Sequence, residues 1–425
     1  MTPVKQAPDT LPDERGLAGE RYDIVIAGGG TVGLALACAL ADALPMNIAV
    51  VDPAALALPP AGRDGRASAV SAGSKRLLAA LGLWTALDPH AEAVAAVDIT
   101  DASLGDAFRP VLVSYDNTVE GGEPATYIVE NERLHAAILA GAERRAGIAF
   151  VAGTAATGYA AGEHGVTITL ADGRALRAPL VVAADGRASR LREAAGIGVV
   201  GWQYRQVGIV TTVKHRKPHR SRAVQNFFPA GPFAILPLKG DRSCVTWTEG
   251  AERGREIMAL DDADFLAQVE KRFGHRLGQI ELAGPREVWP LEMHLARSLV
   301  AERLVLVGDA AHLVHPIAGQ GLNLGLRDVA ALTEVVADAA RLGLDIGSGV
   351  VLARYQRWRR TDAAMSAAAF DGLNRLFSND STLLRTARSA GLGLVDRIPA
   401  LKQFFVAEAA GLTGEVPKLL RGERV

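Results

Sequence analysis

The sequence predicts an α/β protein with a parallel sheet, an inserted antiparallel sheet and a helical C-terminal segment. Three observations support this class. A glycine-rich turn joins an apolar strand to an apolar helix near residue 28. Between residues 205 and 249, short β-rich runs are separated by turns. From residue 354 onward, the composition is helical. With 425 residues and 49% hydrophobic content, the chain is long enough for two or three domains.

The first structural unit of the chain is a strand, a glycine turn, a helix, a second strand and an acid. Residues 22–27 (YDIVIA) are an apolar run typical of a strand buried on both faces. The turn GGGTVG follows, then the alanine-rich helix of residues 34–44, and then the second strand at residues 47–52. This order is that of a Rossmann-like nucleotide-binding unit.

Each residue of this motif has a physical role. Gly28 allows a tight turn, Gly30 lets a pyrophosphate approach the backbone, and Gly33 lets helix and strand pack closely. The helix N-terminus favours phosphate. Asp52 lies 19 residues after Gly33 and can accept hydrogen bonds from a ribose diol. Because a carboxylate repels a 2′-phosphate, an adenosine without that phosphate is favoured.

A second stretch, GIGVVG at residues 196–201, also satisfies the glycine pattern. It follows a helical segment and precedes a β-rich one, which is the wrong context for a nucleotide. We therefore predict a loop that leads into a new strand.

Two later motifs have the same strand-to-acid form. Residues 179–184 end in Asp185-Gly186, and residues 303–307 end in Gly308-Asp309. With the first glycine turn, they resemble the three fingerprints of the aromatic-ring flavin monooxygenases, the para-hydroxybenzoate hydroxylase fold. Four further segments are similar to the ubiquinone-biosynthesis hydroxylases, namely residues 64–84, 227–238, 308–328 and 393–420.

This resemblance implies FAD as cofactor and a set of residues that bind it. Gly28, Gly30, Gly33 and Asp52 would bind the ADP half, and Asp309 the ribitol. Arg66 would approach the flavin, Asn131 the phosphates or ribitol, and Asp185 the pyrophosphate side. The isoalloxazine would be edged by Pro316, Gly319, Gly321, Leu322 and Asn323. Backbone N–H groups at the start of the helix after Gly321 would stabilise negative charge on reduced flavin.

The implied reaction is hydroxylation of the aromatic ring of a polyprenylated phenol or benzoquinol through a flavin C4a-hydroperoxide, with O2 as co-substrate. NAD(P)H or a protein electron donor would supply the electrons. Two alternatives stay open: hydroxylation of another aromatic small molecule or flavin reduction without oxygen insertion, and a flavoprotein subunit that scaffolds a biosynthetic complex.

The inserted sheet is the expected floor of the substrate pocket. Its aromatic side chains could face a prenylated ring, and the candidates are Phe227, Phe228, Phe233 and Trp247. The alternative is that these rings simply fill the core of the sheet.

The stretch from Asp309 to Pro316 contains the only catalytic candidates, His315 and Pro316, which lie next to the expected flavin edge. Spacing by three also makes Asp309, His312 and His315 formal metal-ligand candidates. The flavin interpretation explains Asp309, and the strand-to-loop context breaks the helix that such ligation assumes, so we expect no metal.

The expected domains follow from these motifs. Residues 1–20 form a flexible N-terminus without the apolar segment of a secretory signal. A discontinuous FAD-binding domain comprises 21–95, 126–200 and 296–345. The substrate-binding sheet domain comprises 96–125 and 201–295, and residues 346–425 form the C-terminal helical segment.

Charge and cysteine content bound the partners and the compartment. Forty-six basic and 47 acidic residues give a formal net charge of −1, which argues against nucleic acid. Cys38 and Cys244 lie in apolar contexts and are expected to be buried thiols, as in a reducing compartment. We expect a cytoplasmic protein, peripheral on the inner face of the membrane.

Two segments are candidates for contacts with partners. The run KHRKPHRSR at 214–222 has five Lys or Arg and two His. It is either a solvated hairpin connection or a docking patch for anionic lipid or an acidic subunit of a ubiquinone-biosynthesis complex. The C-terminal region, including LKQFF at residues 401–405, either contacts a membrane or partner or packs on the core.

Overall fold

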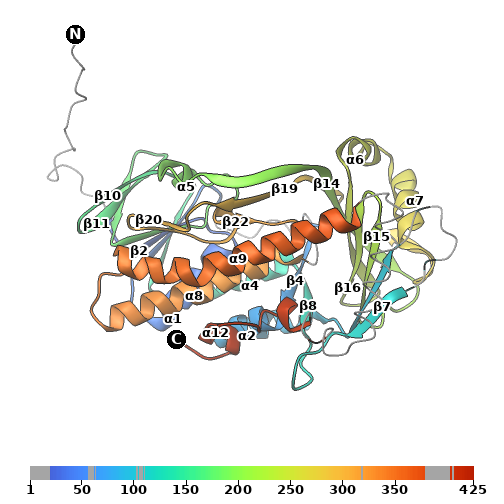
Figure 1. Cartoon of the computed structure of the whole chain (residues 1–425), viewed down its shortest axis with the longest axis horizontal. Helices are drawn as coiled ribbons and strands as arrows, with labels where there is room; N and C mark the ends of the chain where they lie inside the picture. Colours follow the sequence, from blue (N-terminus) through green and yellow to red (C-terminus); the bar gives the residue numbers. More distant parts are fainter. Residues whose placement is uncertain are drawn as a thin grey trace, which may run out of the picture.

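A computed structural model describes the chain at residues 20–55, 62, 64–101, 104, 109, 111–316, 319–378, 403 and 406–425. The molecule is elongated, with a parallel sheet toward one end and a large mainly antiparallel sheet toward the other (Figure 1). Two long helices, α8 (Gly321–Arg341) and α9 (Gly349–Phe377), run between them.

The parallel sheet has six strands in the order β20-β21-β13-β2-β3-β9. Its strands are β2 (Ile24–Ala27), β3 (Ile48–Asp52), β9 (Ile148–Ala152), β13 (Leu180–Ala183), β20 (Val300–Ala301) and β21 (Leu304–Leu306). All neighbours are parallel except β20, which pairs antiparallel with β21. Strands β2, β13 and β21 are buried along their whole length, as the uninterrupted apolar runs predict. Because β2, β13 and β21 are parallel, the glycine turn, the Asp185-Gly186 motif and the Gly308-Asp309 motif that follow them lie at the same end of this sheet, the carboxyl end of its strands.

The helices of this part of the molecule include α1 (Thr31–Ala43), α2 (Ala72–Ala80), α4 (Asn131–Glu143) and α5 (Arg190–Ala194). A short α3 (Trp84–Leu87) and two 3-10 turns, η1 (Asp88–His90) and η2 (Gly308–Ala310), complete them. Helix α1 packs against both α4 and α8. Residues 33–40 of α1 are all buried, so this helix is surrounded by the core.

The second large sheet has the order β22-β19-β14-β17-β16-β15-β6-β7, and β18 also pairs with β14. Its strands are β6 (Ala96–Asp101), β7 (Val111–Asp116), β14 (Val199–His215), β15 (Arg222–Phe228), β16 (Gly231–Leu238), β17 (Arg242–Gly250), β18 (Ile280–Leu282), β19 (Glu287–Ala296) and β22 (His312–Leu313). The pairs are antiparallel except β6 with β15, which is parallel. The predicted antiparallel sheet is thus present, with one parallel pair. Its edge strand β22 comes from a range expected to belong wholly to the cofactor domain.

Two smaller sheets flank the parallel one. The three-stranded sheet has the order β4-β8-β5, and the four-stranded sheet has the order β1-β12-β11-β10. Their strands are β1 (Glu20–Arg21), β4 (Ala67–Ser71), β5 (Glu92–Ala93), β8 (Thr126–Glu130), β10 (Ala156–Gly162), β11 (Gly165–Leu170) and β12 (Ala175–Ala178).

One face of the large sheet is covered by α6 (Ala251–Met258) and α7 (Asp262–Phe273), as Figure 1 shows. Three of the four predicted pocket aromatics, Phe228, Phe233 and Trp247, lie in the hydrophobic core on this face, together with Phe265 of α7. The core-packing alternative therefore describes these three rings. Phe227 points to the opposite face, because side chains alternate along a strand, and it stacks on Phe377 with ring centroids 4.0 Å apart.

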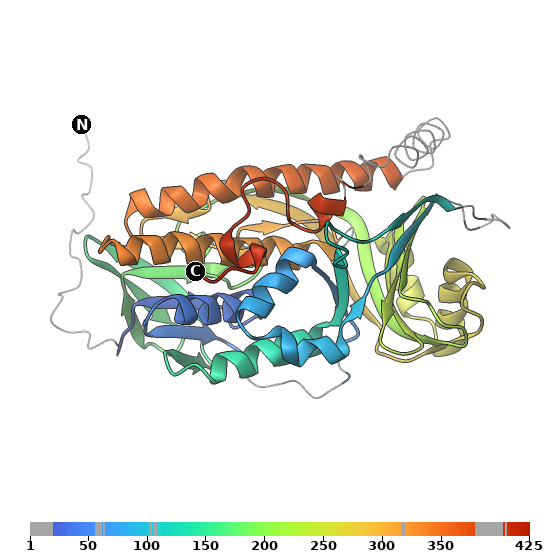
Figure 2. The ribbon, with the colours of Figure 1, turned by 90° about the horizontal axis from the view of Figure 1, so that it is seen from below.

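The end of the chain returns to the parallel-sheet side of the molecule. Residues 406–425, including α12 (Lys418–Arg421), lie against α2 and α8 (Figure 2). Among their contacts, the N–H of Gly73 donates to the carbonyl of Ala410 at 3.0 Å, and the indole of Trp358 donates to the carbonyl of Glu415 at 2.9 Å. This part packs on the core. The LKQFF segment lies outside the described residues except for Gln403.

The structure also describes the second glycine stretch, the basic run and the two cysteines. The second glycine stretch is a turn after α5 that leads into β14 at Val199. The basic run ends β14 and connects it to β15 at Arg222. Cys38 and Cys244 are fully buried, and burial raises the pKa of their thiols to about 11 and about 12. None of the helices in the described part of the chain has the length and apolar character that a membrane span requires.

Replacing Phe233 by Ala should destabilise the protein by about 3–5 kcal/mol, because a fully buried ring leaves a cavity between the sheet and α7. Denaturant unfolding measures this change. The matched control is Val288→Ala on β19, where the side chain is 44% exposed and the expected change is about 0.5 kcal/mol or less. A change at Phe233 as small as the control's would contradict the assignment of this ring to the core.

Candidate active site

The glycine turn after β2 contains two positions, Gly28 and Gly33, at which the packing of the protein leaves no room for a side chain. Gly28 has a φ of +113°, and a Cβ there would lie 2.1 Å from the carbonyl oxygen of Ala184. A Cβ on Gly33 would lie 2.0 Å from the carbonyl oxygen of Gly28. Both glycines are therefore explained by the close approach of β2, β13 and α1.

Gly30 differs from them, since a Cβ there would meet nothing within 4 Å and its backbone is ordinary, with φ −71° and ψ 178°. It is the N-cap of α1, so the unpaired N–H groups of that helix lie beside open space. Asp52 holds the turn in place: its Oδ2 accepts from the N–H of Gly29 at 2.7 Å, and its Oδ1 from the N–H of Ala54 at 2.8 Å. This cradle fits a phosphate group.

A cavity of about 440 Å³ begins at this turn and crosses the edge of the parallel sheet. Six of the predicted cofactor residues line it: Gly30, Arg66, Asn131, Asp309, Gly321 and Leu322. The other lining residues are Thr31, Val32, Asp64, Ser68, Glu132, Leu134, His135, Ala184, Gly186, Val307 and Gly308. The three sequence motifs, separate in the chain, thus meet around one space.

Arg66 and Asn131 lie on the wall formed by β4 and α4. The guanidinium of Arg66 binds the carboxylate of Asp64 through Nε at 2.8 Å and Nη2 at 2.6 Å, which raises the pKa of Arg66. Glu287 of β19 lies 3.7 Å from the same Nε. The amide oxygen of Asn131 accepts from the hydroxyl of Ser68 at 2.7 Å. Both predicted residues are therefore held in place by neighbours.

Asp309 lies in the η2 turn at the end of β21. Its side chain faces the cavity, and the surrounding protein atoms partly remove its solvation, which raises the pKa of its carboxyl. Its backbone carbonyl accepts from Nε2 of His294 at 2.9 Å, which ties the turn to β19. A carboxylate that faces the cavity and is anchored through its backbone suits a hydroxyl-bearing chain such as ribitol.

Helix α8 points its N-terminus at the cavity. The N–H groups of Gly321, Leu322 and Asn323 have no acceptor within the helix, and they carry the positive end of a 21-residue helix dipole. The side chain of Asn323 does not face the cavity: its amide oxygen accepts from the N–H of Ser71 at 3.0 Å and from the hydroxyl of Ser74 at 2.8 Å. Gly319 has φ +63°, which a side chain would strain.

The Asp185-Gly186 motif contributes mainly backbone to the cavity. Oδ2 of Asp185 accepts from the N–H of Arg190 at 2.9 Å, so this carboxylate caps α5, and its Oδ1 is buried without a partner in the described structure. Arg192, which is buried, donates to the carbonyls of Ala310 at 2.9 Å and Arg187 at 3.0 Å. It joins the second motif to the third.

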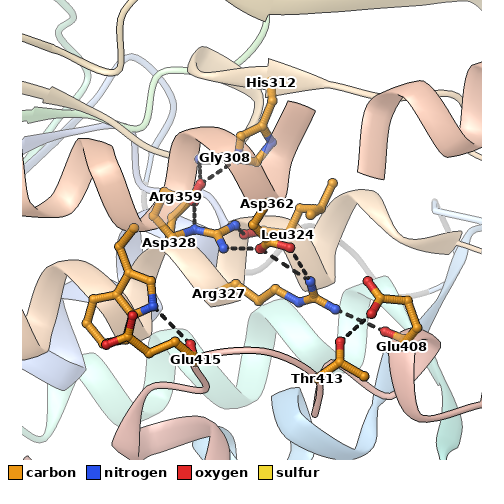
Figure 3. A network of polar contacts seen from close by, with 11 residues as sticks. Gly308, His312, Leu324, Arg327, Asp328, Arg359, Asp362, Glu408, Thr413 and Glu415 are labelled. Atoms are coloured by element: carbon orange, nitrogen blue, oxygen red, sulfur yellow. Dashed lines mark hydrogen bonds and ion pairs between the residues drawn. The ribbon is translucent and has the colours of Figure 1, made fainter. Parts of the chain in front are cut away.

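A buried ionic network lies behind the Asp309 turn (Figure 3). The carboxylate of Asp328 accepts from the N–H of Gly308 at 2.9 Å, Nε2 of His312 at 2.7 Å and Nε of Arg359 at 2.7 Å. Burial raises the pKa of Asp328, but the charges and hydrogen bonds of His312 and Arg359 outweigh it, and the pKa lies at about 2. The turn is thereby fixed to α8 and α9.

His315 lies in the loop between β22 and α8 and is 1% exposed. Its ring meets the ring of Tyr204 edge to face at 5.1 Å, and both its nitrogens lack hydrogen-bond partners in the described structure. Burial lowers the pKa of His315 to about 4, so the imidazole is neutral near pH 7. Pro316, beside it, is exposed.

A metal site does not form here, because His312 is committed to Asp328 while Asp309 faces the cavity. Across the described ranges, no group of three or more His, Cys, Asp or Glu side chains could hold a metal ion. Sequence reasoning missed Asp328, Arg192 and Arg359, all of which support the cavity. Only Asp328 had a signal, its place at the end of the glycine-rich third motif.

The phosphate cradle, the anchored carboxylate and the helix N-terminus around one cavity fit a dinucleotide cofactor, and the relatives of this chain identify the class as FAD-dependent monooxygenases. A family model described as FAD binding domain matches residues 21–366. The chain is 44% identical over 413 residues to ubiquinone hydroxylase UbiL of Rhodospirillum rubrum, covering 96% of this chain and 94% of the relative. It is 34% identical over 394 residues to 3-demethoxyubiquinol 3-hydroxylase of Escherichia coli, covering 92% and 98%.

Among solved structures, p-nitrophenol 4-monooxygenase PnpA from Pseudomonas putida DLL-E4 shares the fold. Its TM-score is 0.77 at 19% identity, with 93% of this chain and 99% of that chain covered. This chain belongs to the ubiquinone-biosynthesis flavin hydroxylase family, and the predicted resemblance is confirmed.

The two glycines of the first turn should respond differently to a methyl group. Gly28→Ala should lower the free energy of unfolding by about 3 kcal/mol or more, because of the positive φ and the clash with Ala184. Gly30→Ala should change it by about 1 kcal/mol or less, yet weaken FAD binding at least tenfold. Urea unfolding and FAD titration measure the two effects. Unchanged FAD affinity in Gly30→Ala would contradict the phosphate cradle.

Replacing Asp328 by Asn should cost about 3 kcal/mol near pH 7, because the buried guanidinium of Arg359 would lose its fully buried carboxylate partner and keep only the partly exposed Asp362. Since the folded pKa of about 2 lies below the ordinary 3.8, this stabilisation is complete above pH 4 and lost as the pH falls toward 2. The stability gap between wild type and variant should shrink over that range. The control, Asp338→Asn, breaks a half-exposed ion pair on the same helix and should cost about 1 kcal/mol or less. A gap that is constant down to pH 2 would argue against the buried pair.

Proposed function

We propose that this protein hydroxylates the aromatic ring of a polyprenylated phenol or benzoquinol intermediate of ubiquinone biosynthesis. FAD is the cofactor, O2 the co-substrate, and NAD(P)H or a protein electron donor the reductant. The observation that carries the proposal is the cavity that joins the Gly30 cradle to Asp309 and the start of α8, in a chain similar along almost its whole length to ubiquinone hydroxylases.

FAD bound in this cavity would supply the oxygen activation. Gly30 and the N-terminus of α1 would hold its phosphates, and Asp309 would accept hydrogen bonds from its ribitol. The N–H groups of Gly321 and Leu322 would stabilise negative charge beside them, in a site partly closed to water. Arg66 and Asn131 would face it from the opposite wall. Asp52 and Asp185 would act by shaping the backbone, since their carboxylates bind main-chain N–H groups.

The aromatic substrate would bind on the face of the large sheet away from α6 and α7. This face packs against β4 through a hydrophobic cluster that includes Ala69, Val210 and Cys244. Strand β4 begins directly after Arg66 in the chain, so this face lies close to the cofactor cavity. Of the proposed aromatic residues, Phe227 is the one that points this way. The apolar surface would exclude water from the ring being oxidised.

His315 and Pro316 remain our proposed catalytic residues. A neutral, buried imidazole with both nitrogens unpaired can accept a hydrogen bond from a phenol hydroxyl and so favour its ionisation. The exposed Pro316 would shape the loop between that imidazole and α8.

A peripheral location on the inner face of the cytoplasmic membrane, or a place in a ubiquinone-biosynthesis complex, would suit this substrate. The end of β14 and the turn that leads to β15 expose Lys214, Arg216, Lys217 and Arg220, which could contact anionic lipid or an acidic partner. A role as a flavin-free scaffold is disfavoured, because Gly30 and Asp309 line a cavity with room and polar groups for a cofactor.

A strain lacking the gene should accumulate a quinone precursor that misses one ring hydroxyl, measured by mass spectrometry of lipid extracts. The wild-type gene should restore the quinone. Asp309→Ala should lower the restored level at least tenfold, because it removes the ribitol acceptor. Asp172→Ala, in an exposed turn of the four-stranded sheet, is the control and should restore it fully. Unchanged quinone in the deletion strain would refute the proposed function.

A further inference from the structure

A second cavity, of about 540 Å³, lies between α9 and the paired strands β14 and β19. Its walls are apolar and include Val200, Leu295, Leu299, Ala311 and Ala363. Among the described residues, it shares no lining side chain with the cofactor cavity. The segment from Val307 to His312 nevertheless borders both spaces, so this groove lies next to the cofactor site without being part of it.

One residue of the groove wall, His312, has a ring nitrogen that the protein leaves unpaired. His312 lines the groove and is 2% exposed. Its Nε2 donates to the charged carboxylate of Asp328, whereas its Nδ1 is buried with no hydrogen-bond partner in the described structure. Buried nitrogens of this kind are rare in folded proteins, and each one calls for a partner. An apolar groove lined by a few polar side chains is typical of a ligand site.

The rim of the groove is positively charged. Arg297 and Arg360 both line it, and both side chains are exposed. Neither guanidinium has an ion-pair partner in the part of the chain that the structure describes. These groups can stabilise negative charge on an oxygen, or the face of an aromatic ring.

We propose that this groove is a second binding site for a phenol or quinol with an apolar chain. The chain would lie against Val200, Leu295 and Leu299, and the hydroxyl would bind Nδ1 of His312. A hydroxyl suits this atom because it can donate to a neutral imidazole or accept from a protonated one. The ligand class rests on the proposed function, whereas the groove and its unpaired nitrogen do not.

The site is joined to the cofactor cavity by one carboxylate. Asp328 binds His312 and also accepts from the N–H of Gly308, the residue before Asp309. A ligand that orders His312 therefore also orders the turn that faces the cofactor. By thermodynamic linkage, a ligand that tightens FAD binding in this way has its own binding in the groove strengthened by FAD to the same extent.

The test uses 4-nonylphenol and the FAD-loaded protein in equilibrium dialysis. Ala364→Trp fills the groove from an exposed position on α9, and Ala368→Trp is the matched control one turn further along, outside the groove. Wild type and Ala368→Trp should bind one equivalent more than Ala364→Trp. Val200→Trp, also from an exposed position, should reproduce the loss from the opposite wall.

Two further measurements test the chemistry of the site. The methyl ether of nonylphenol should bind the groove about tenfold more weakly, because it cannot donate to His312. Saturating nonylphenol should tighten FAD binding about fivefold in Ala368→Trp and leave it unchanged in Ala364→Trp.

Equal stoichiometry in both Trp variants would overturn the inference, as would equal affinity for phenol and ether. Groove binding in a protein whose deletion leaves quinone unchanged would support the site and refute the proposed function. A quinone defect without groove binding would support the proposed function and refute the second site.

Discussion

The arrangement of the active site depends on the hydrogen bonds and ion pairs that surround the buried carboxylate of Asp328. A charge with no solvent exposure is tolerated only where several donors surround it. Its donors come from three separate segments: the main chain of Gly308, His312 after η2, and Arg359 on α9. Moving any of these segments would weaken the hydrogen bonds to this charge, so the three segments restrict one another's movement.

The same network extends to the end of the chain. Arg359 also binds Asp362, which in turn pairs with Arg327 at 3.0 Å, and Arg327 donates to the carbonyl of Glu408 at 3.1 Å (Figure 3). On the other side of α8, the amide of Asn323 binds Ser71 and Ser74. The start of α8 is therefore supported from two sides, which keeps its N–H groups directed at the cavity.

Features that depend on residues close together in the chain could be predicted from the sequence, whereas features that depend on contacts between distant residues could not. The residues from Gly28 to Asp52 and the Gly308-Asp309 pair were identified because their signals are local: a strand, a turn and a helix start within a few residues. Asp328 ends the third motif, but its ion pair could not be predicted locally, since Arg359 lies 31 residues further along the chain. Strand alternation places Phe227 and Phe228 on opposite faces, but only the packing of α6 and α7 decides which face is core. The parallel pairing of β6 with β15 joins segments more than 120 residues apart and likewise leaves no local trace.

The short strand β22 gives the two halves of the molecule a shared element. It pairs with β19, where His294 lies opposite Leu313, and His294 also binds the carbonyl of Asp309. The turn that faces the cofactor is thus joined to the edge of the large sheet as well as to an end of the parallel sheet. A chimaera that exchanges the large sheet between relatives would therefore have to exchange residues 308–313 with it. The boundary suitable for recombination lies inside the cofactor motif, not at the ends of the inserted sequence.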